Sequence, residues 1–287
     1  MIRNKLFPWL KRQRRRYGRH KRLYVHDGED TASRLRMNMK SRYEFINRSR
    51  GKDQLVIIVA GYNDELWRLV LPRVAAFTDP ESCDVVVVPG TDSEALRSAC
   101  TTHKWSFLRT EENRLALAQN LAIADHPSAQ PIAKLDEDII VSDRWLEWLV
   151  ETREGVEADG RFDIGIVAPT LNVNGFTYRL LLERAGVLAG YEARFGPARQ
   201  SCMNTPIWDS TEAAAFMWSL LEPFDDSIRK LQTEGPEYSA CPHRFSIGCF
   251  LIHRQMWEKM GGAPLPRTAS WASRKLTSVF TAWPSPE

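Results

Sequence analysis

The sequence has few cysteines, no long apolar run and no leader-like N-terminus. Its five cysteines are scattered, form no C-x-x-C pair and match no zinc-binding spacing, so we expect reduced thiols, as in a cytosolic protein. Cys249 lies inside an apolar segment and is expected in the core. No stretch approaches the roughly 18 apolar residues of a membrane span, and the basic first residues lack the apolar segment of a signal peptide. These absences predict a cytoplasmic protein.

Several common catalytic and phosphate-binding motifs are also missing. No G-x-G-x-x-G or G-K-(S/T) segment occurs to surround a phosphate. Ser246 lies in S-I-G and not in G-x-S-x-G, which disfavours a hydrolase nucleophile. His243 and His253 are too far apart for a local pair of metal ligands, which favours structural or surface roles for both.

Acidic residues are absent from the first 22 positions, where ten Lys and Arg side chains gather. Residues 1–50 carry a net charge of +12, and the remainder therefore carries −9. The basic arm also holds a small apolar cluster, L-F-P-W-L, at residues 6–10. That pairing suits an anionic membrane surface on the inner face of the membrane. Nucleic acid and a solvated tail are the alternatives.

Apolar segments alternate with helical patterns through the middle of the chain. Continuous apolar runs at residues 54–60 and 84–88 predict buried parallel strands. A short third strand is expected at 105–109, and a further strand at 131–135 leads to a group of acids. Helical spacing follows the first three, at residues 65–77, with Pro72 as a kink or break, and at 93–102 and 112–125. This order predicts an α/β fold with a mostly parallel central sheet flanked by helices.

The remaining segments complete three predicted regions. Residues 1–50 are a basic arm with a lead-in helix from Ser33 to Asn47, residues 51–262 form the α/β domain, and residues 263–287 form a poorly ordered tail that favours a helix around 270–280. A helix after Ser142 or Asp143 is expected to use one of them as its cap. Further strands are expected within 162–169 and 245–252. Residues 170–244 suggest loops and helices over the active face.

Three acids, Asp136, Glu137 and Asp138, separate two apolar segments. An unpaired carboxylate between buried segments is unfavourable, and a divalent cation at the strand end would keep it ionised. Mg²⁺ and Mn²⁺ take such oxygen ligands and bridge to phosphates. A solvated acidic turn is the alternative. Asn63 and Asp92 also follow predicted strands, so all these side chains are expected to line one crevice.

The order of these motifs resembles a family 2 glycosyltransferase of the GT-A fold, over about residues 54–262. The residues that carry it are strand-(A/G)-Y-N, strand-x-G-T-D, E-N-R-x-x-x-A-Q-N-x-A, K-L-D-E-D and S-I-G-x-x-x-I-x-R-x-x-W-x-x-M-G-G. The resemblance implies a nucleotide-diphospho-sugar donor, Mn²⁺ or Mg²⁺ at a D-x-D motif, and inversion at the anomeric carbon.

The same resemblance implies site residues at matching positions. Ala60, Tyr62 and Asn63 at the first strand end would contact the nucleotide, as would Asn120. Thr91 and Asp92 would lie near the base and ribose. Asp138 would be the direct ligand of the metal. Asp136 would contact either the ribose or the metal, the latter through a water molecule.

The chain departs from the family after the second glycine of its G-G turn. No acid follows Gly262 until Glu287, although the family places its catalytic base there, and the family's C-terminal metal-binding His is also missing. A C-terminus that is truncated or altered relative to the family is one explanation. A base supplied from elsewhere is the other, and the candidates are Asp225, Asp226, Glu234 and Glu237. Val88 and Pro89 also replace an acid that usually contributes to base recognition.

The function expected from these features is sugar transfer to a saccharide or lipid-linked acceptor in bacterial surface-polysaccharide synthesis. A nucleotide-sugar-binding protein without transfer activity is one alternative, since the usual base is missing. A nucleic-acid-associated protein that uses the basic arm is the other. Trp145 and Trp148 suggest packing, while Trp208 and Trp218 are candidates for acceptor stacking or for the core.

Overall fold

The computed structural model describes residues 43–111, 113–160, 164–201, 206–232, 238–241, 248–262 and 279–281. The basic arm, with the membrane and nucleic-acid predictions that depend on it, lies outside these ranges. So do most of the predicted tail and several residues named above, Cys202, Glu234, Glu237, His243 and Ser246. Within the described ranges, no helix is long and apolar enough to cross a membrane.

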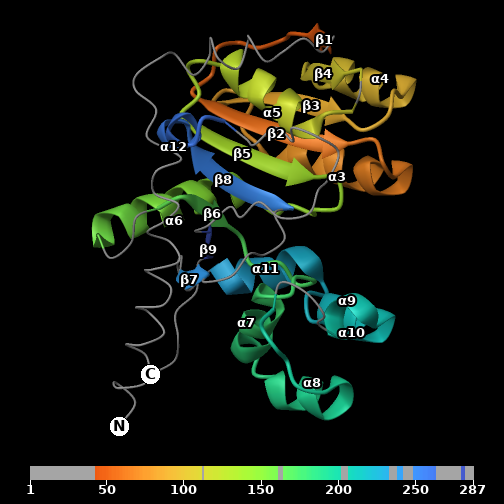
Figure 1. Cartoon of the computed structure of the whole chain (residues 1–287). Helices are drawn as coiled ribbons and strands as arrows, with labels where there is room; N and C mark the ends of the chain where they lie inside the picture. Colours follow the sequence, from red (N-terminus) through yellow and green to blue (C-terminus); the bar gives the residue numbers. More distant parts are fainter. Residues whose placement is uncertain are drawn as a thin grey trace, which may run out of the picture.

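Four parallel strands form the centre of the sheet (Figure 1), in the order β4 (Ser106–Thr110), β3 (Cys83–Pro89), β2 (Gln54–Ala60) and β5 (Pro131–Asp136). Their side chains are almost entirely buried, because helices cover both faces of the sheet. The predicted fold class, an α/β domain with a mostly parallel central sheet flanked by helices, is confirmed.

Three helices connect these strands, α3 (Asp64–Phe77), α4 (Glu94–Thr102) and α5 (Leu115–Ala124). Asn63 caps α3 by accepting bonds from the Glu65 and Leu66 amides, and Ser93 caps α4. Helix α3 runs across Pro72 without a break. All three helices were predicted within a few residues of their observed ends.

Antiparallel pairing extends the sheet beyond β5. Strand β8 (Cys249–His253) runs antiparallel to β5, and β6 (Ile166–Ala168) pairs antiparallel with β8. Two further strands follow, β9 (Val279–Thr281) parallel to β6 and β7 (Ser239–Cys241) antiparallel to β9. The sequence predicted β6 and β8 but neither β7 nor β9.

The predicted lead-in helix from Ser33 to Asn47 is wrong for the residues that the structure describes. Residues 43–46 form β1 (Tyr43–Ile46), an edge strand antiparallel to β4. Aromatic and β-branched side chains favour this strand, and Arg97 pairs with Glu44 at 2.7 Å to tie it to α4. The predicted cap of α6 (Trp145–Asp159) is also wrong, because Arg144, in a left-handed conformation, precedes the helix and no side chain caps it.

Two apolar layers cover the sheet. Helices α3, α4 and α6 pack on one face, around Trp67, Leu96 and Trp145. On the other face, α5 and α12 (Arg254–Lys259) contribute Leu121 and Trp257 to the second layer. Helix α12 also supplies the buried Arg254, which donates to the carbonyls of residues 123, 126 and 129 at the end of α5. These bonds tie the end of α5 and the loop that follows it to the start of α12.

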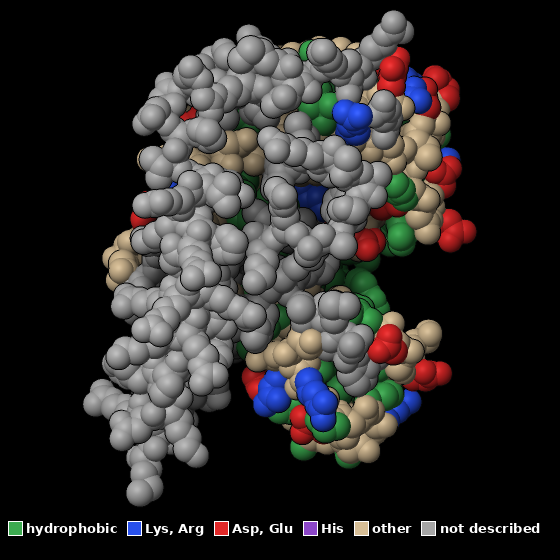
Figure 2. All heavy atoms as spheres, viewed as in Figure 1, with side chains coloured by type: hydrophobic (Ala, Val, Ile, Leu, Met, Phe, Trp, Pro, Cys, Tyr) green, Lys and Arg blue, Asp and Glu red, His purple; other side chains and the backbone are tan. Residues whose placement is uncertain are grey.

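A helical lobe lies beneath the sheet in Figure 1. It consists of α7 (Thr177–Arg184), α8 (Leu188–Phe195), α9 (Pro206–Asp209), α10 (Thr211–Ser219) and α11 (Phe224–Gln232). Tyr178 and Tyr191 lie at its centre in a separate apolar cluster. The surface is indented between the lobe and the sheet layers (Figure 2). The sequence predicted loops and helices in this region, but it did not predict that the helices pack around a separate apolar cluster.

The four described cysteines, Cys83, Cys100, Cys241 and Cys249, are buried free thiols. Burial raises the pKa of Cys83 to about 11 and the pKa of Cys249 to about 12. The expected place of Cys249 in the core is confirmed.

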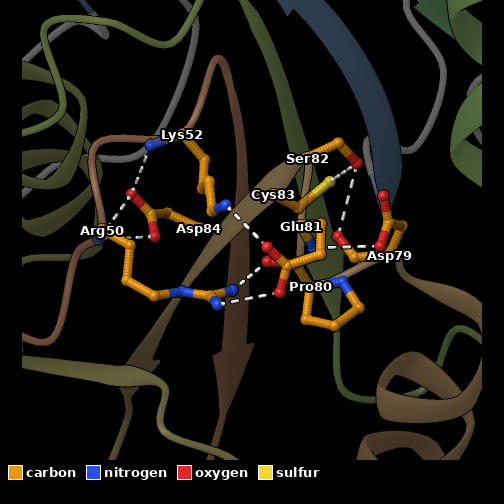
Figure 3. Close-up of polar contacts among 8 residues, drawn as sticks. All are labelled: Arg50, Lys52, Asp79, Pro80, Glu81, Ser82, Cys83 and Asp84. Atoms are coloured by element: carbon orange, nitrogen blue, oxygen red, sulfur yellow. Dashed lines mark hydrogen bonds and ion pairs between the residues drawn. The ribbon is translucent and has the colours of Figure 1, made fainter.

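Asp84 anchors the amino-terminal end of the sheet (Figure 3). Its buried carboxylate accepts bonds from the Ser49 hydroxyl at 2.6 Å and from the amides of Arg50 and Lys52 at 2.9 and 3.1 Å. Burial alone would raise the pKa of Asp84, but these bonds outweigh it and lower the pKa. The loop that leads into β2 is thus tied to the start of β3.

We predict that Asp84→Asn lowers the free energy of unfolding at pH 7 by about 1 to 3 kcal/mol, because the amide is a weaker acceptor. The folded-state pKa of Asp84 is lowered, so its stabilising contribution is complete above the unfolded pKa of about 3.9 and disappears as pH falls through the folded pKa. Urea unfolding of both proteins between neutral and acid pH should therefore show a difference that narrows toward acid. Asp53→Asn, at an exposed acid nearby, is the control. A difference independent of pH would contradict this account.

Candidate functional site

The carboxyl ends of β2, β3 and β5 meet at one edge of the sheet. Pairing places Ala60 beside Pro89 and Val59 beside Asp136. The loops that follow are bonded to each other, since the Gly90 amide donates to the Ala60 carbonyl at 2.7 Å. The Thr91 hydroxyl also donates to the carbonyl of residue 61. The strand ends that the sequence predicted to share a crevice do lie together.

Tyr62 spans this edge. Its amide donates to the Glu137 carboxylate at 3.0 Å, which joins the end of β2 to the turn after β5. Its ring lies against Gly90, where a Cβ atom would come within 2.3 Å of the ring. Its hydroxyl donates to Asn113 at 3.1 Å, yet the side chain is 53% exposed. An aromatic face is therefore available to a ligand at this edge.

The three acids of the K-L-D-E-D segment have different environments. Asp136, the last residue of β5, is partly exposed, Glu137 is buried and Asp138 is exposed. Glu137 lies in the turn after β5 and is held inward by the Tyr62 amide. The sequence did not predict this structural role of Glu137.

Lys134 is the second residue that the sequence analysis missed. It lies two positions before Asp136, on the same face of β5, and its ammonium donates to Asp136 Oδ1 at 2.5 Å. The Lys134 side chain is only 7% exposed, and its strand neighbours are Ile57 and Phe250. Burial raises the pKa of Asp136, and the Lys134 ammonium offsets this only in part.

The carboxylates fit a hard cation only as part of a ligand set. Within the residues that the structure describes, no group of three or more His, Cys, Asp and Glu side chains could hold a metal ion. Asp136 Oδ2 faces Gly248, where a Cβ atom would lie 3.8 Å from this oxygen. Together with the exposed Asp138, this gives oxygen donors of the type that Mg²⁺ and Mn²⁺ use when phosphates and water complete the shell.

The other predicted nucleotide contacts have structural partners already. Asn63 caps α3. Asp92 pairs with Arg97 at 2.8 Å and Arg109 at 3.0 Å, and the bond from Arg97 lowers the pKa of Asp92. Asn120 is fully buried, and its side-chain oxygen accepts from Trp257 Nε1 at 3.0 Å. Their contact with a nucleotide stays a prediction.

The two described candidates for the base lie in the first turn of α11. Asp225 forms an ion pair with Arg73 of α3, whose Nε also donates to the Val141 carbonyl at 2.8 Å. Asp226 pairs with Arg229 at 2.8 Å. Asp225 thus connects the helical lobe to the segment that follows the acidic triplet, and the base role of both residues stays a prediction.

The lobe also carries two exposed aromatic side chains. Trp208 is 41% exposed and Trp218 is 37% exposed. The core interpretation of these two residues is wrong, whereas Trp145 is buried and packs as predicted.

We predict that Glu137→Ala lowers the free energy of unfolding by about 1.5 to 3 kcal/mol, because it removes a charged acceptor from the Tyr62 amide. Glu137→Gln keeps an acceptor and should cost less. Urea unfolding measures the change, and hydrogen exchange should show faster exchange of the Tyr62 amide in Glu137→Ala. Glu65→Ala, at an exposed acid of α3, is the control. If both alanine variants lost the same free energy of unfolding, the stabilising role of the bond between Glu137 and the Tyr62 amide would be refuted.

Comparisons with known proteins give partial similarities. No protein-family model and no curated protein matches the chain. S. aureus TarS 1-349, solved in complex with UDP-GlcNAc, is 14% identical over 41% of this chain and 34% of its own, with a TM-score of 0.33. Mannosyltransferase PcManGT from Pyrobaculum calidifontis, in complex with GDP-Man and Mn²⁺, is 17% identical over 54% of this chain and 53% of its own, with a TM-score of 0.32.

Glucosyl-3-phosphoglycerate synthase from Mycobacterium tuberculosis is a third similar structure, solved with Mn²⁺, UDP and glucosyl-3-phosphoglycerate. It is 14% identical over 63% of this chain and 61% of its own, with a TM-score of 0.33. The chain thus spans between about a third and three fifths of the length of these three solved chains. The similarity to nucleotide-sugar transferase structures is partial in each case.

Proposed function

We propose that this protein is a glycosyltransferase that moves a sugar from a nucleotide-diphospho-sugar to a saccharide or lipid-linked acceptor. The observation that carries the proposal is the meeting of three strand-end loops at one edge. Glu137 joins two of these loops through the Tyr62 amide, and the Asp136 and Asp138 carboxylates lie in the turn where β5 ends. Ligands of parallel α/β sheets bind at such an edge. The ordered motifs of the sequence support the same assignment.

In this proposal the nucleotide lies across the ends of β2 and β3. The exposed ring of Tyr62 stacks on the base, while Thr91 and Asp92 lie near the base and ribose. Asp138 binds Mn²⁺ or Mg²⁺ directly, and Asp136 contacts the ribose or a metal-bound water. An ion held by these two carboxylates would supply positive charge against the diphosphate.

The acceptor side belongs to the helical lobe. Trp208 and Trp218 offer exposed aromatic faces on which an acceptor sugar can stack. Inversion requires a base that removes the proton of the attacking hydroxyl. We assign this role to Asp225. Its carboxylate separates from Arg73 and then accepts the proton of the acceptor hydroxyl. Asp226 is the alternative base. We further propose that the acceptor is a saccharide or a lipid-linked saccharide. The reaction would then belong to bacterial surface-polysaccharide synthesis at the inner face of the membrane.

The donor assignment is tested by calorimetry with UDP-, GDP- and CMP-sugars, each with and without Mn²⁺. We expect metal-dependent binding of one nucleotide class. Asp138→Asn should weaken this binding about tenfold or more, because a direct metal ligand is lost. Asp143→Asn, which alters another exposed acid close by, should leave it unchanged. Binding of none of these nucleotides would refute the proposal and favour the nucleic-acid alternative.

The transfer step is tested by release of free nucleotide in the presence of an acceptor panel. Asp225→Asn should lower kcat about 100-fold or more, as expected for loss of a general base, and leave donor affinity unchanged. Asp226→Asn is the matched variant on the same helical turn. A larger loss in Asp226→Asn would move the role to that residue. Donor binding by the wild-type protein without any turnover would instead establish a silent nucleotide-sugar-binding protein.

A further inference from the structure

An ammonium group lies inside the sheet, directly beneath the proposed donor site. The Lys134 side chain is 7% exposed and its Nζ lies 2.5 Å from Asp136 Oδ1. Strand β5 is central, with β2 on one side and β8 on the other, so the Lys134 backbone is fixed by pairing on both edges. Lys134 lies on the same face of β5 as Ile132, which packs in the apolar layer of α5 and α12.

This ammonium shares a carboxylate with the proposed metal site. A divalent ion on Asp136 or on the nearby Asp138 would lie close to Lys134 Nζ, and like charges repel strongly where solvent is limited. We propose that Lys134 is the resident cation of Asp136 and sets the order of binding, so that the divalent ion binds here only together with the donor diphosphate. This inference rests on the proposed function.

The diphosphate resolves the conflict between the two cations. Its negative charges attract both the ammonium and the divalent ion, so the diphosphate offsets the repulsion between these two cations. The same geometry gives Lys134 a second effect. Its fixed positive charge attracts the diphosphate before any metal is present, and the nucleotide therefore binds weakly to the metal-free protein. Lys134 is a positioning and charge-setting residue in this account.

The wild-type protein gives the first test. Binding of Mn²⁺ alone is followed by loss of the free Mn²⁺ signal in electron paramagnetic resonance, and binding of UDP and GDP by calorimetry without metal. We expect negligible binding of Mn²⁺ alone, weak binding of one nucleotide alone, and tight binding of the two together. Mn²⁺ binding that is equally tight with and without the nucleotide would overturn the inference.

Lys134→Met gives the second test, because Met preserves length and apolar packing and removes the charge. Mn²⁺ alone should bind about tenfold more tightly or better to this variant, and the metal-free nucleotide about tenfold more weakly. The two changes have opposite signs, whereas a damaged fold would weaken both. Lys52→Met is the matched control, since Lys52 pairs with Glu81 at the opposite end of the sheet, at 3.2 Å. It should change neither affinity.

The double variant Lys134→Met with Asp136→Asn locates the effect. It carries no charge at either position, so it should fold if the single variant does not, and it should lose the gain in Mn²⁺ affinity. A gain that persists in the double variant would overturn the inference, as would unchanged affinities in Lys134→Met. Absence of any nucleotide binding by the wild-type protein would refute the proposed function itself, and the inference with it. Nucleotide binding with unchanged variant affinities would refute the inference alone.

Discussion

The central constraint on this fold is that charged groups within or at the ends of a buried sheet must find partners there. The Lys134 side chain is only 7% exposed, and its ammonium is paired with Asp136 on the same strand. Glu137 accepts the Tyr62 amide for the same reason, on the other face of the turn. The proposed donor site is thus built from side chains that the packing of the sheet already forces into fixed positions.

The two ends of the sheet use the same solution for different purposes. At the amino-terminal end, the Asp84 carboxylate accepts bonds from the Ser49 hydroxyl and from the amides of Arg50 and Lys52, of which Figure 3 draws the two amides. These bonds tie the loop before β2 to β3. At the carboxyl-terminal end, Glu137 forms one such tie. Asp136 and Asp138 retain oxygens that accept no bond from the loops within the described part of the chain. A saturated carboxylate can only stabilise. A partly satisfied one can also bind a ligand, and the carboxyl-terminal edge holds both kinds side by side.

The sequence predicted the parallel core well, because long apolar runs bounded by polar turns have few other folded solutions. It also predicted that residues following the strands, such as Asn63, Asp92 and Asp136, lie at one edge of the sheet. The reason is that parallel strands all end at the same edge. Strand β1 could not be predicted, because its pairing with β4 depends on a distant segment. The helical lobe has no strong apolar periodicity, and its core forms from five short helices. The Lys134–Asp136 pair was visible in principle, since residues two apart on a strand share a face, yet that spacing does not reveal how deeply the lysine is buried.

Burial decides which of the carboxylates can change partners. The ion pair between Arg73 and Asp225 is partly open to water, with the two side chains 22% and 46% exposed. Such pairs contribute little, about 0 to 1 kcal/mol, so Asp225 can leave Arg73 at a small cost. Asp136 has less freedom, because the side chain of its partner Lys134 is only 7% exposed. In the proposed site, the sheet therefore offers fixed charge, which would suit recognition of a diphosphate. The helical lobe offers an exchangeable carboxylate, which the proposed removal of a proton from an acceptor hydroxyl would require.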